Sequence, residues 1–265
     1  MALTEPVDSH VRGEVLARLV TDALLPSLEL VAQQHRFLAW GPDGRLRALF
    51  ENENIQSDLV FSRGGLTVDC LCLGEPDTII AVESSEMIGA LIKGRFDFPV
   101  TITRGVWRAD LLGRFAGLLS AMAVSFATIS ATGGNADVFR LIVEIAMRAA
   151  AVVGAADPHV FDVIRGMEGE ALTISNCSRD RYGTLTFYSD NIAFSRDSRE
   201  PAAATLSLGS PALLRNIIMK KTDPMEAYSA GKINCSGESV LFVAMVYLLI
   251  RLCDHLDYHP WLQNR

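Results

Sequence analysis

The first half of the chain alternates between helical and strand-like spacing of its apolar residues. Apolar positions from Val15 to Gln34 follow the period of an α-helix, and Pro26 predicts a kink or a break within it. After the turn signal Asp43-Gly44 the period changes to two, which is typical of strands. The predicted elements are strands at 59–61, 66–72, 78–82 and 99–103, and helices at 84–92 and 107–122.

The second half begins after a change in composition. The polar, glycine-bearing stretch from Ser130 to Asp137 separates two strongly apolar segments, so we expect a linker there. A helix is predicted at 138–153, followed by strands at 160–164, 171–177, 183–188 and 203–208. Ser210-Pro211 then predicts a capped helix, because serine is a preferred cap and proline suits the first helical position.

The two halves match without gaps over one segment, residues 80–92 against residues 206–218. Apolar residues stand at the same positions of both segments, and a further strand and helix follow in each half. The second half inserts about seven residues around 222–228. This internal repeat predicts two domains of one α+β type, at 1–130 and 131–265.

Composition and charge narrow the class of protein. Apolar residues make up 49% of the 265 residues and the net charge is −7, so we expect a globular protein without a nucleic-acid partner. The mean hydropathy is +0.24, but polar residues interrupt 111–131 and Arg251 ends the apolar run at 240–250. We therefore expect no transmembrane segment. Because the N-terminus has no signal-peptide pattern and the five cysteines lack C-x-x-C spacing, we expect a cytoplasmic protein.

One segment near the C-terminus carries a specific pattern: Asp223-Pro224, Ala227, Gly231-Lys232-Ile233 and Gly237. It resembles the sterol carrier protein type 2 family, whose domain is a five-stranded sheet backed by helices around an apolar tunnel. The resemblance implies two sterol-carrier-like α+β units, each a mainly antiparallel five-stranded sheet covered by helices. The first unit looks like a degenerate copy, because residues 94–99 replace the Gly-Lys-Ile segment and the Asp-Pro helix is missing.

The resemblance implies a hydrophobic small-molecule ligand, such as a lipid, sterol or acyl chain, and no cofactor. Apolar residues of the two helices in the second half are expected to line its cavity: Leu213, Leu214, Ile217, Ile218, Phe242, Met245, Val246 and Leu249. Plain core packing explains the same residues equally simply. The sequence leaves the oligomeric state open, a homo-oligomer included, as well as a role of the two halves as an interaction module only.

An enzyme on the same scaffold is the alternative function. A cavity that folds a flexible apolar chain suits a cyclase or isomerase of polyketide or terpenoid biosynthesis, if polar groups face inward. The candidate catalytic residues are Asp157, His159, Arg181 and Tyr188, with His159 as a general acid or base. A turn and a solvated charge cluster explain the same residues.

The other groups of polar residues and cysteines give no prediction of a metal or catalytic site. His255 and His259 would share a helical face, but the glutamate of a helical zinc motif is absent and Pro260 disfavours helix at His259, so we expect an exposed helix end and no metal site. Cys70 and Cys72 are expected on one face of a strand, where two small core residues explain them better than a metal does. No phosphate-binding loop or nucleophile elbow is present.

Overall fold

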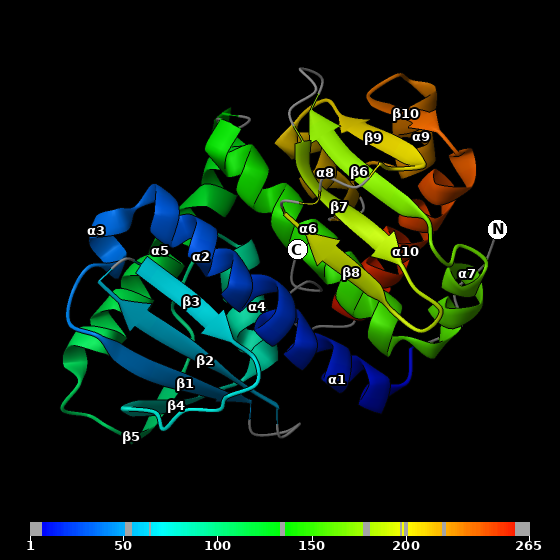
Figure 1. The fold of residues 1–265 in the computed structure, drawn as a ribbon. Helices are drawn as coiled ribbons and strands as arrows, with labels where there is room; N and C mark the ends of the chain where they lie inside the picture. Colours follow the sequence, from blue (N-terminus) through cyan, green and yellow to red (C-terminus); the bar gives the residue numbers. More distant parts are fainter. Residues whose placement is uncertain are drawn as a thin grey trace. The chain divides into compact units, whose positions relative to one another are not determined.

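The computed structural model describes residues 7–50, 55–63, 65–132, 136–176, 181–196, 198, 201–218 and 221–257. Contacts between Cα atoms divide the chain into two units (Figure 1). The first unit holds residues 16–131, and the second unit holds residues 132–265 together with residues 1–15. The division into two separate domains at residue 130 stays a prediction.

The N-terminal helical run changes its geometry just before a proline. α1 (Ser9–Arg18), the π-helical turn η1 (Leu19–Leu24) and α2 (Leu25–Gln34) follow one another, and the short α3 (Arg36–Ala39) comes next. Proline has no N–H and its ring clashes with the carbonyl four residues earlier. The wider π turn before Pro26 relieves that clash, so the disturbance predicted at Pro26 is a widened turn.

The sheet of the first unit has the strand order β3-β2-β1-β4-β5. Its strands are β1 (Gly44–Phe50), β2 (Ile55–Ser62), β3 (Gly65–Asp69), β4 (Thr78–Val82) and β5 (Val100–Arg104). β1 runs antiparallel to β2 and parallel to β4, and both outer pairs are antiparallel. Leu46, Ala48 and Phe50 alternate along β1 and are buried, as expected of the inward face of a sheet. α4 (Ser84–Ile92) and α5 (Ala109–Thr132) lie behind the strands in Figure 1.

The sheet of the second unit has the same order in corresponding strands, β8-β7-β6-β9-β10. Its strands are β6 (Ala171–Asn176), β7 (Arg181–Phe187), β8 (Ile192–Ser195), β9 (Ala204–Leu208) and β10 (Ile233–Gly237). β6 is antiparallel to β7 and parallel to β9, and both outer pairs are again antiparallel. The helical elements are α6 (Ala136–Ala156), η2 (Pro158–Val160), α7 (Phe161–Arg165), α8 (Pro211–Ile218), α9 (Pro224–Ser229) and α10 (Ser239–Asp257).

The predicted fold class is confirmed: the chain is α+β, with two five-stranded, mainly antiparallel sheets and covering helices. α6 packs on β7 and β8, while α8 and α10 pack on β9. The two halves differ in length around residues 222–228, and in the second unit this segment holds α9. In the first unit, residues 93–99 connect α4 to β5 without a helix.

Several predicted elements are wrong. Residues 160–164 form the end of η2 and most of α7 instead of a strand, because Asp157 caps this segment and Pro158 starts a helical turn. The strand expected at 66–72 ends at Asp69. The linker expected at 130–137 is partly helical, since α5 continues to Thr132 and α6 begins at Ala136. β1 and β8 were not predicted.

Two helices are long and apolar enough to cross a membrane, judged by length and composition alone. They cover Ala109–Thr128, of which 44% is buried, and Ser239–Leu256, of which 72% is buried. The second is mostly enclosed, as is typical of the core helix of a globular unit. The absence of a transmembrane segment stays a prediction.

Candidate functional site

A pocket opens in the second unit beside the Asp-Pro segment that the sequence singles out. Its volume is about 270 Å³. α8, the start of α9 and the second half of α10 form its walls. Its lining residues are Ile217, Thr222, Asp223, Pro224, Leu249, Ile250 and Cys253.

Side-chain caps fix the starts of α8 and α9, the two shorter helices beside the pocket. Ser210 Oγ accepts a hydrogen bond from the main-chain N–H of Leu213 at 3.2 Å, which fixes the start of α8. Asp223 Oδ1 accepts from the N–H groups of Met225 and Glu226 at 2.7 and 3.0 Å, and Pro224 occupies the first turn of α9. The segment that resembles the family motif therefore builds one side of the pocket.

The pocket has an apolar base and a polar edge. Ile217, Leu249 and Cys253 are buried, whereas Ile250 and Asp223 are exposed at the opening. The thiol of Cys253 donates to the carbonyl oxygen of Ile217, with a distance of 3.6 Å between sulfur and oxygen. Among the described residues that line the pocket there is no lysine, arginine or histidine. The site therefore favours an uncharged apolar group.

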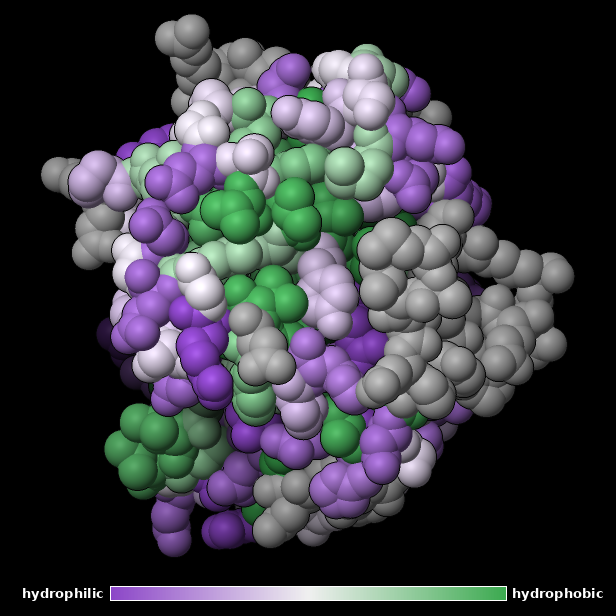
Figure 2. Space-filling view, turned by 90° about the vertical axis from the view of Figure 1, so that its right-hand side faces the viewer, coloured by the Kyte–Doolittle hydropathy of each residue, from purple (hydrophilic) through white to green (hydrophobic). Residues whose placement is uncertain are grey.

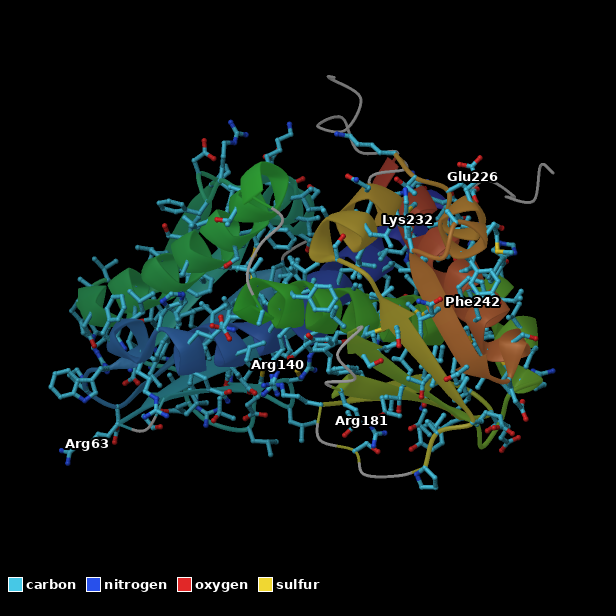
Figure 3. All side chains as sticks on the ribbon, turned by 90° about the horizontal axis from the view of Figure 1, so that it is seen from above. Arg63, Arg140, Arg181, Glu226, Lys232 and Phe242 are labelled. Atoms are coloured by element: carbon cyan, nitrogen blue, oxygen red, sulfur yellow. The ribbon has the colours of Figure 1, made fainter. Side chains whose placement is uncertain are left out.

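The eight residues predicted to line a cavity divide between the pocket and the core. Ile217 and Leu249 line the pocket. Phe242 is placed on α10 in Figure 3, and its ring centroid lies 4.5 Å from that of Tyr228 in α9. The predicted residues that are buried but do not line this pocket are Leu213, Leu214, Phe242, Met245 and Val246. Ile218 belongs to α8, and its side chain lies outside the described residues.

Hydrophobic side chains also gather on the surface beside these helices. α9 and α10 expose Met225, Tyr228, Val240, Val243 and Ile250. Figure 2 shows hydrophobic side chains gathered on the side of the molecule where α9 and α10 lie in Figure 1. An apolar ligand that outgrows the pocket therefore has apolar surface close by.

Of the candidate catalytic residues, Asp157 is held in a buried polar network. Its Oδ2 lies 2.7 Å from Arg251 Nη2 and 3.0 Å from His255 Nε2, and its Oδ1 accepts from the N–H of His159. Asp157, Arg251 and His255 are all buried. Burial is the largest influence on the pKa of Asp157 and raises it, but hydrogen bonds from His255 and Arg251 outweigh burial and lower the pKa to about 2. The carboxylate is therefore a structural anion that joins η2 to α10.

The other three candidates lie elsewhere. His159 is exposed, and its carbonyl oxygen accepts a hydrogen bond from Tyr247 at 3.3 Å. Arg181 donates to Thr173 Oγ1 at 2.7 Å, and Tyr188 is exposed. None of the four lines the pocket.

Arg251 and His255 were not predicted as partners of Asp157. The expectation of an exposed helix end at His255 is wrong, because this side chain is fully buried. His259 lies outside the described residues. Two polar residues four apart in an otherwise apolar helix share one face, and that spacing was the available signal for a buried polar partner. Within the described part of the chain, no group of three or more His, Cys, Asp or Glu side chains could hold a metal ion.

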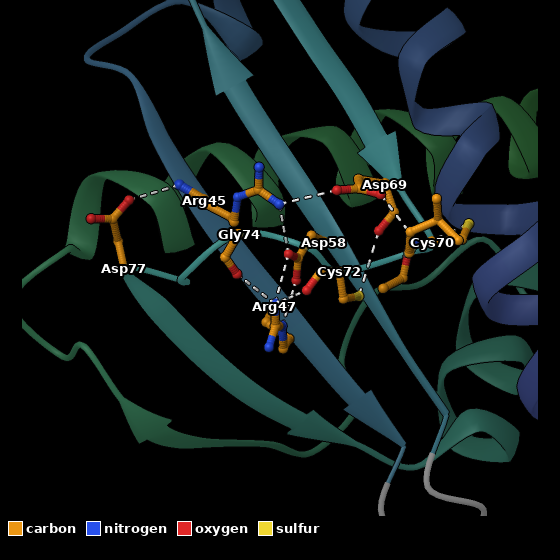
Figure 4. A network of polar contacts seen from close by, with 10 residues as sticks. Arg45, Arg47, Asp58, Asp69, Cys70, Cys72, Gly74 and Asp77 are labelled. Carbon is orange, nitrogen blue, oxygen red and sulfur yellow. Dashed lines mark hydrogen bonds and ion pairs between the residues drawn. The ribbon is translucent and has the colours of Figure 1, made fainter.

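The first unit has its own buried carboxylate, Asp58 on β2 (Figure 4). Its oxygens lie 2.8 Å from Arg45 Nη1 and 2.6 Å from Arg47 Nε, both on β1. Burial raises the pKa of Asp58, but hydrogen bonds and charge from Arg47 and Arg45 outweigh it and lower the pKa. Arg47 also donates to the carbonyl oxygens of Cys72 and Gly74, so the network fastens the segment after β3 onto the sheet.

Cys70 and Cys72 lie in that segment rather than on a strand. Cys72 has a positive φ of 53°, which ends the strand geometry. Burial, followed by the charge of Asp58, raises the pKa of the Cys72 thiol to about 11. A thiol of this kind is a poor nucleophile at neutral pH.

Two solved structures that are similar to this chain match less than half of its length. No protein-family model matches it, and no curated protein matches it. A solved structure described as "UbiJ-SCP2 Ubiquinone synthesis protein" is 11% identical with a TM-score of 0.34, and the match covers 41% of this chain and 95% of that one. "Sterol Carrier Protein 2 from Yarrowia Lipolytica (apo form)" is 15% identical with a TM-score of 0.28, and the match covers 38% of this chain and 91% of that one. Membership in the family and descent of the first unit from a degenerate copy stay predictions.

Proposed function

We propose that the second unit binds an uncharged apolar small molecule, such as a sterol or an acyl chain, in the pocket between α8, α9 and α10. The observation that carries this proposal is the composition of the pocket: a buried base of Ile217, Leu249 and Cys253 below an opening with an exposed Ile250. Apolar groups leave water readily for such a surface, while a free carboxylate would find no cation among the lining residues that the structure describes.

The volume limits how much of a ligand the pocket takes. At about 30 Å³ per water molecule in the liquid, 270 Å³ corresponds to roughly nine waters. This is at the lower limit of ordinary ligand sites, so the pocket accepts one end of a larger molecule. Burial of five methylenes contributes about 4 kcal/mol before the cost of association, which is too little for tight binding. The rest of the ligand must therefore contact the apolar surface next to the opening, such as the exposed Met225 beside Pro224.

The pocket supports binding without a reaction. None of Asp157, His159, Arg181 and Tyr188 lines it, and Asp157 is neutralised by Arg251 and His255. A cyclase or isomerase would need such a group beside the ligand. The catalytic alternative, the duplication of one unit, cytoplasmic location and assembly into a homo-oligomer stay predictions.

Two substitutions on one helix test the pocket. Ile250 lines the opening and Val243 does not, although both are exposed on α10 and stand about two helical turns apart. Ile250→Trp should fill the opening and weaken binding of Nile red, an uncharged apolar dye, about fivefold or more. Val243→Trp should leave the affinity within about twofold of the original chain. These changes correspond to about 1 kcal/mol and to less than 0.5 kcal/mol.

The measurement is a fluorescence titration with Nile red, followed by its displacement with dodecanol. Native mass spectrometry of the purified chain adds a search for an apolar molecule that remains bound. An unchanged affinity in Ile250→Trp, or a chain that binds neither Nile red nor dodecanol, would refute the proposal. Far-UV circular dichroism establishes that both variants fold.

A further inference from the structure

The first unit has a larger groove of its own, with a volume of about 570 Å³. It lies between α2 and α3 on one side and the turn from β2 to β3 on the other. This volume is within the range of sites for small molecules. None of the described residues that line the pocket of the second unit lines this groove.

The groove combines a buried apolar floor with exposed aromatic walls. Ala32 and Leu66 are buried at the floor, whereas Phe37 is 74% exposed and Trp40 is 75% exposed. A Cβ atom added to Gly65 would meet nothing within 4 Å, so this wall is open. Large aromatic side chains that lie so exposed beside a concavity offer contact area to a flat or apolar partner.

Two arginines stand at the edge of the groove. Arg36 and Arg63 are exposed lining residues, and neither has a carboxylate partner within the described part of the chain. Figure 3 shows the side chain of Arg63 standing away from the ribbon. The acidic residue of the groove, Glu29, accepts a hydrogen bond from the N–H of Val68 at 2.8 Å and so is engaged with the edge of β3. In a chain with a net charge of −7, this edge is locally cationic.

We propose that this groove binds an anionic amphiphile, with its apolar body against Phe37, Trp40 and Leu66 and its phosphate or carboxylate group between Arg36 and Arg63. Guanidinium groups bind such oxyanions through paired, charge-assisted hydrogen bonds. The chemistry contrasts with that of the pocket in the second unit, whose described lining residues include no cation. The ligand could be a free amphiphile or the headgroup and upper chain of an anionic lipid.

The test is isothermal titration calorimetry with decyl phosphate below its micelle concentration, in a chain that carries Ile250→Trp to restrict the second pocket. Trp40→Ala should weaken binding about tenfold, because the aromatic wall is lost. Its control is Trp107→Ala, since Trp107 is 78% exposed and does not line the groove.

The double variant R36E/R63E should also weaken binding about tenfold, whereas Arg104→Glu, on the exposed strand β5, should change it less than about twofold.

The remaining ligands identify the source of the anion. Binding of decyl phosphate with this variant pattern supports a free amphiphile. Binding of phosphatidylglycerol vesicles alone, with the same pattern and no binding of phosphatidylcholine vesicles, supports a lipid headgroup. Equal binding of uncharged decyl maltoside, equal effects of Trp40→Ala and Trp107→Ala, or no binding of decyl phosphate and vesicles would overturn the proposal. If R36E/R63E fails to fold by circular dichroism, R36Q/R63Q takes its place.

Discussion

The two units place different side chains at the same position of the same sheet. In the first unit, Arg47 of β1 stands opposite Asp58 of β2, and in the second unit Thr173 of β6 stands opposite Thr184 of β7. On their other side, Arg47 and Thr173 pair with the neighbouring parallel strand. Arg47 stands beside Ile79 of β4, and Thr173 stands beside Thr205 of β9. One strand order thus accepts either an ion pair or a pair of hydroxyl groups at its centre.

The difference changes what lies over the sheet. Arg47 reaches the carbonyl oxygens of Cys72 and Gly74, and therefore the segment between β3 and β4 is bound to the strands beneath it. In the second unit the two threonine hydroxyl oxygens lie 3.3 Å apart, and Arg181 donates to Thr173 at 2.7 Å and to Thr184 at 3.5 Å. The second unit keeps a buried carboxylate at the end of α6 instead, where Asp157 binds Arg251 and His255 of α10. These two networks therefore fasten a loop in the first unit and a helix in the second.

The largest effect is expected from Asp157→Ala. Arg251 and His255 are almost fully buried, so removal of the carboxylate takes the nearest anion away from the buried Arg251, whose next carboxylate, that of Asp254, lies 3.8 Å from Nη1. We expect a loss of about 3–5 kcal/mol in the free energy of unfolding. Urea unfolding followed by far-UV circular dichroism measures it, with Asp190→Ala as the exposed control. A loss below about 1 kcal/mol would mean that the network does not stabilise the second unit.

A smaller effect is expected from Asp58→Ala. The side chains of Arg45 and Arg47 are 23% and 16% exposed, so water partly solvates them once Asp58 is removed. We expect a loss of about 2–3 kcal/mol, below the full value for a completely buried pair. In a chain that carries Trp261→Phe, the two remaining tryptophans, Trp40 and Trp107, belong to the first unit, and their fluorescence during urea unfolding reports its stability.

Thr184→Val is the matched control for Asp58→Ala, because it changes the corresponding position of the other sheet. It removes one hydroxyl partner of Thr173, and we expect a loss of about 1 kcal/mol. Equal losses in the two variants would show that the ion pair contributes no more than the hydroxyl pair.

The smallest loss of stability is expected when the pH is lowered. The pKa of Asp157 is about 2 in the folded chain and 3.8 in the reference state, so its contribution is complete above the reference pKa and is lost as the pH falls toward 2. Asp58, whose pKa is also lowered, should act in the same direction in the first unit.

Urea midpoints at pH about 7, 4 and 2.5 test this expectation. Asp157→Asn removes the titrating group, so its stability should fall less steeply below pH about 4 than that of the original chain. Parallel curves for the two chains would contradict it.

Local signals explain which elements were predictable. Ser210-Pro211 and Asp223-Pro224 carry their caps within a few residues, and the structure has helices at both places. The short apolar run at 160–164 is compatible with strand or helix, and only the cap at Asp157 distinguishes them. β1 shows a clear alternation of Arg45, Leu46, Arg47 and Ala48, but its charged face looks like a solvated segment until Asp58 is placed beside it.

By itself, the sequence determined the α+β class, the capped helix α8 and an apolar face on most helices, because hydrophobic period, caps and turns act over a few residues. Only the tertiary structure decided which of those apolar residues line a pocket and which fill the core, since that depends on how closely α8, α9 and α10 approach one another. It also decided that Asp157 meets Arg251 and His255, 94 and 98 residues along the chain. Pairings at that distance arise from packing, and no local pattern encodes them.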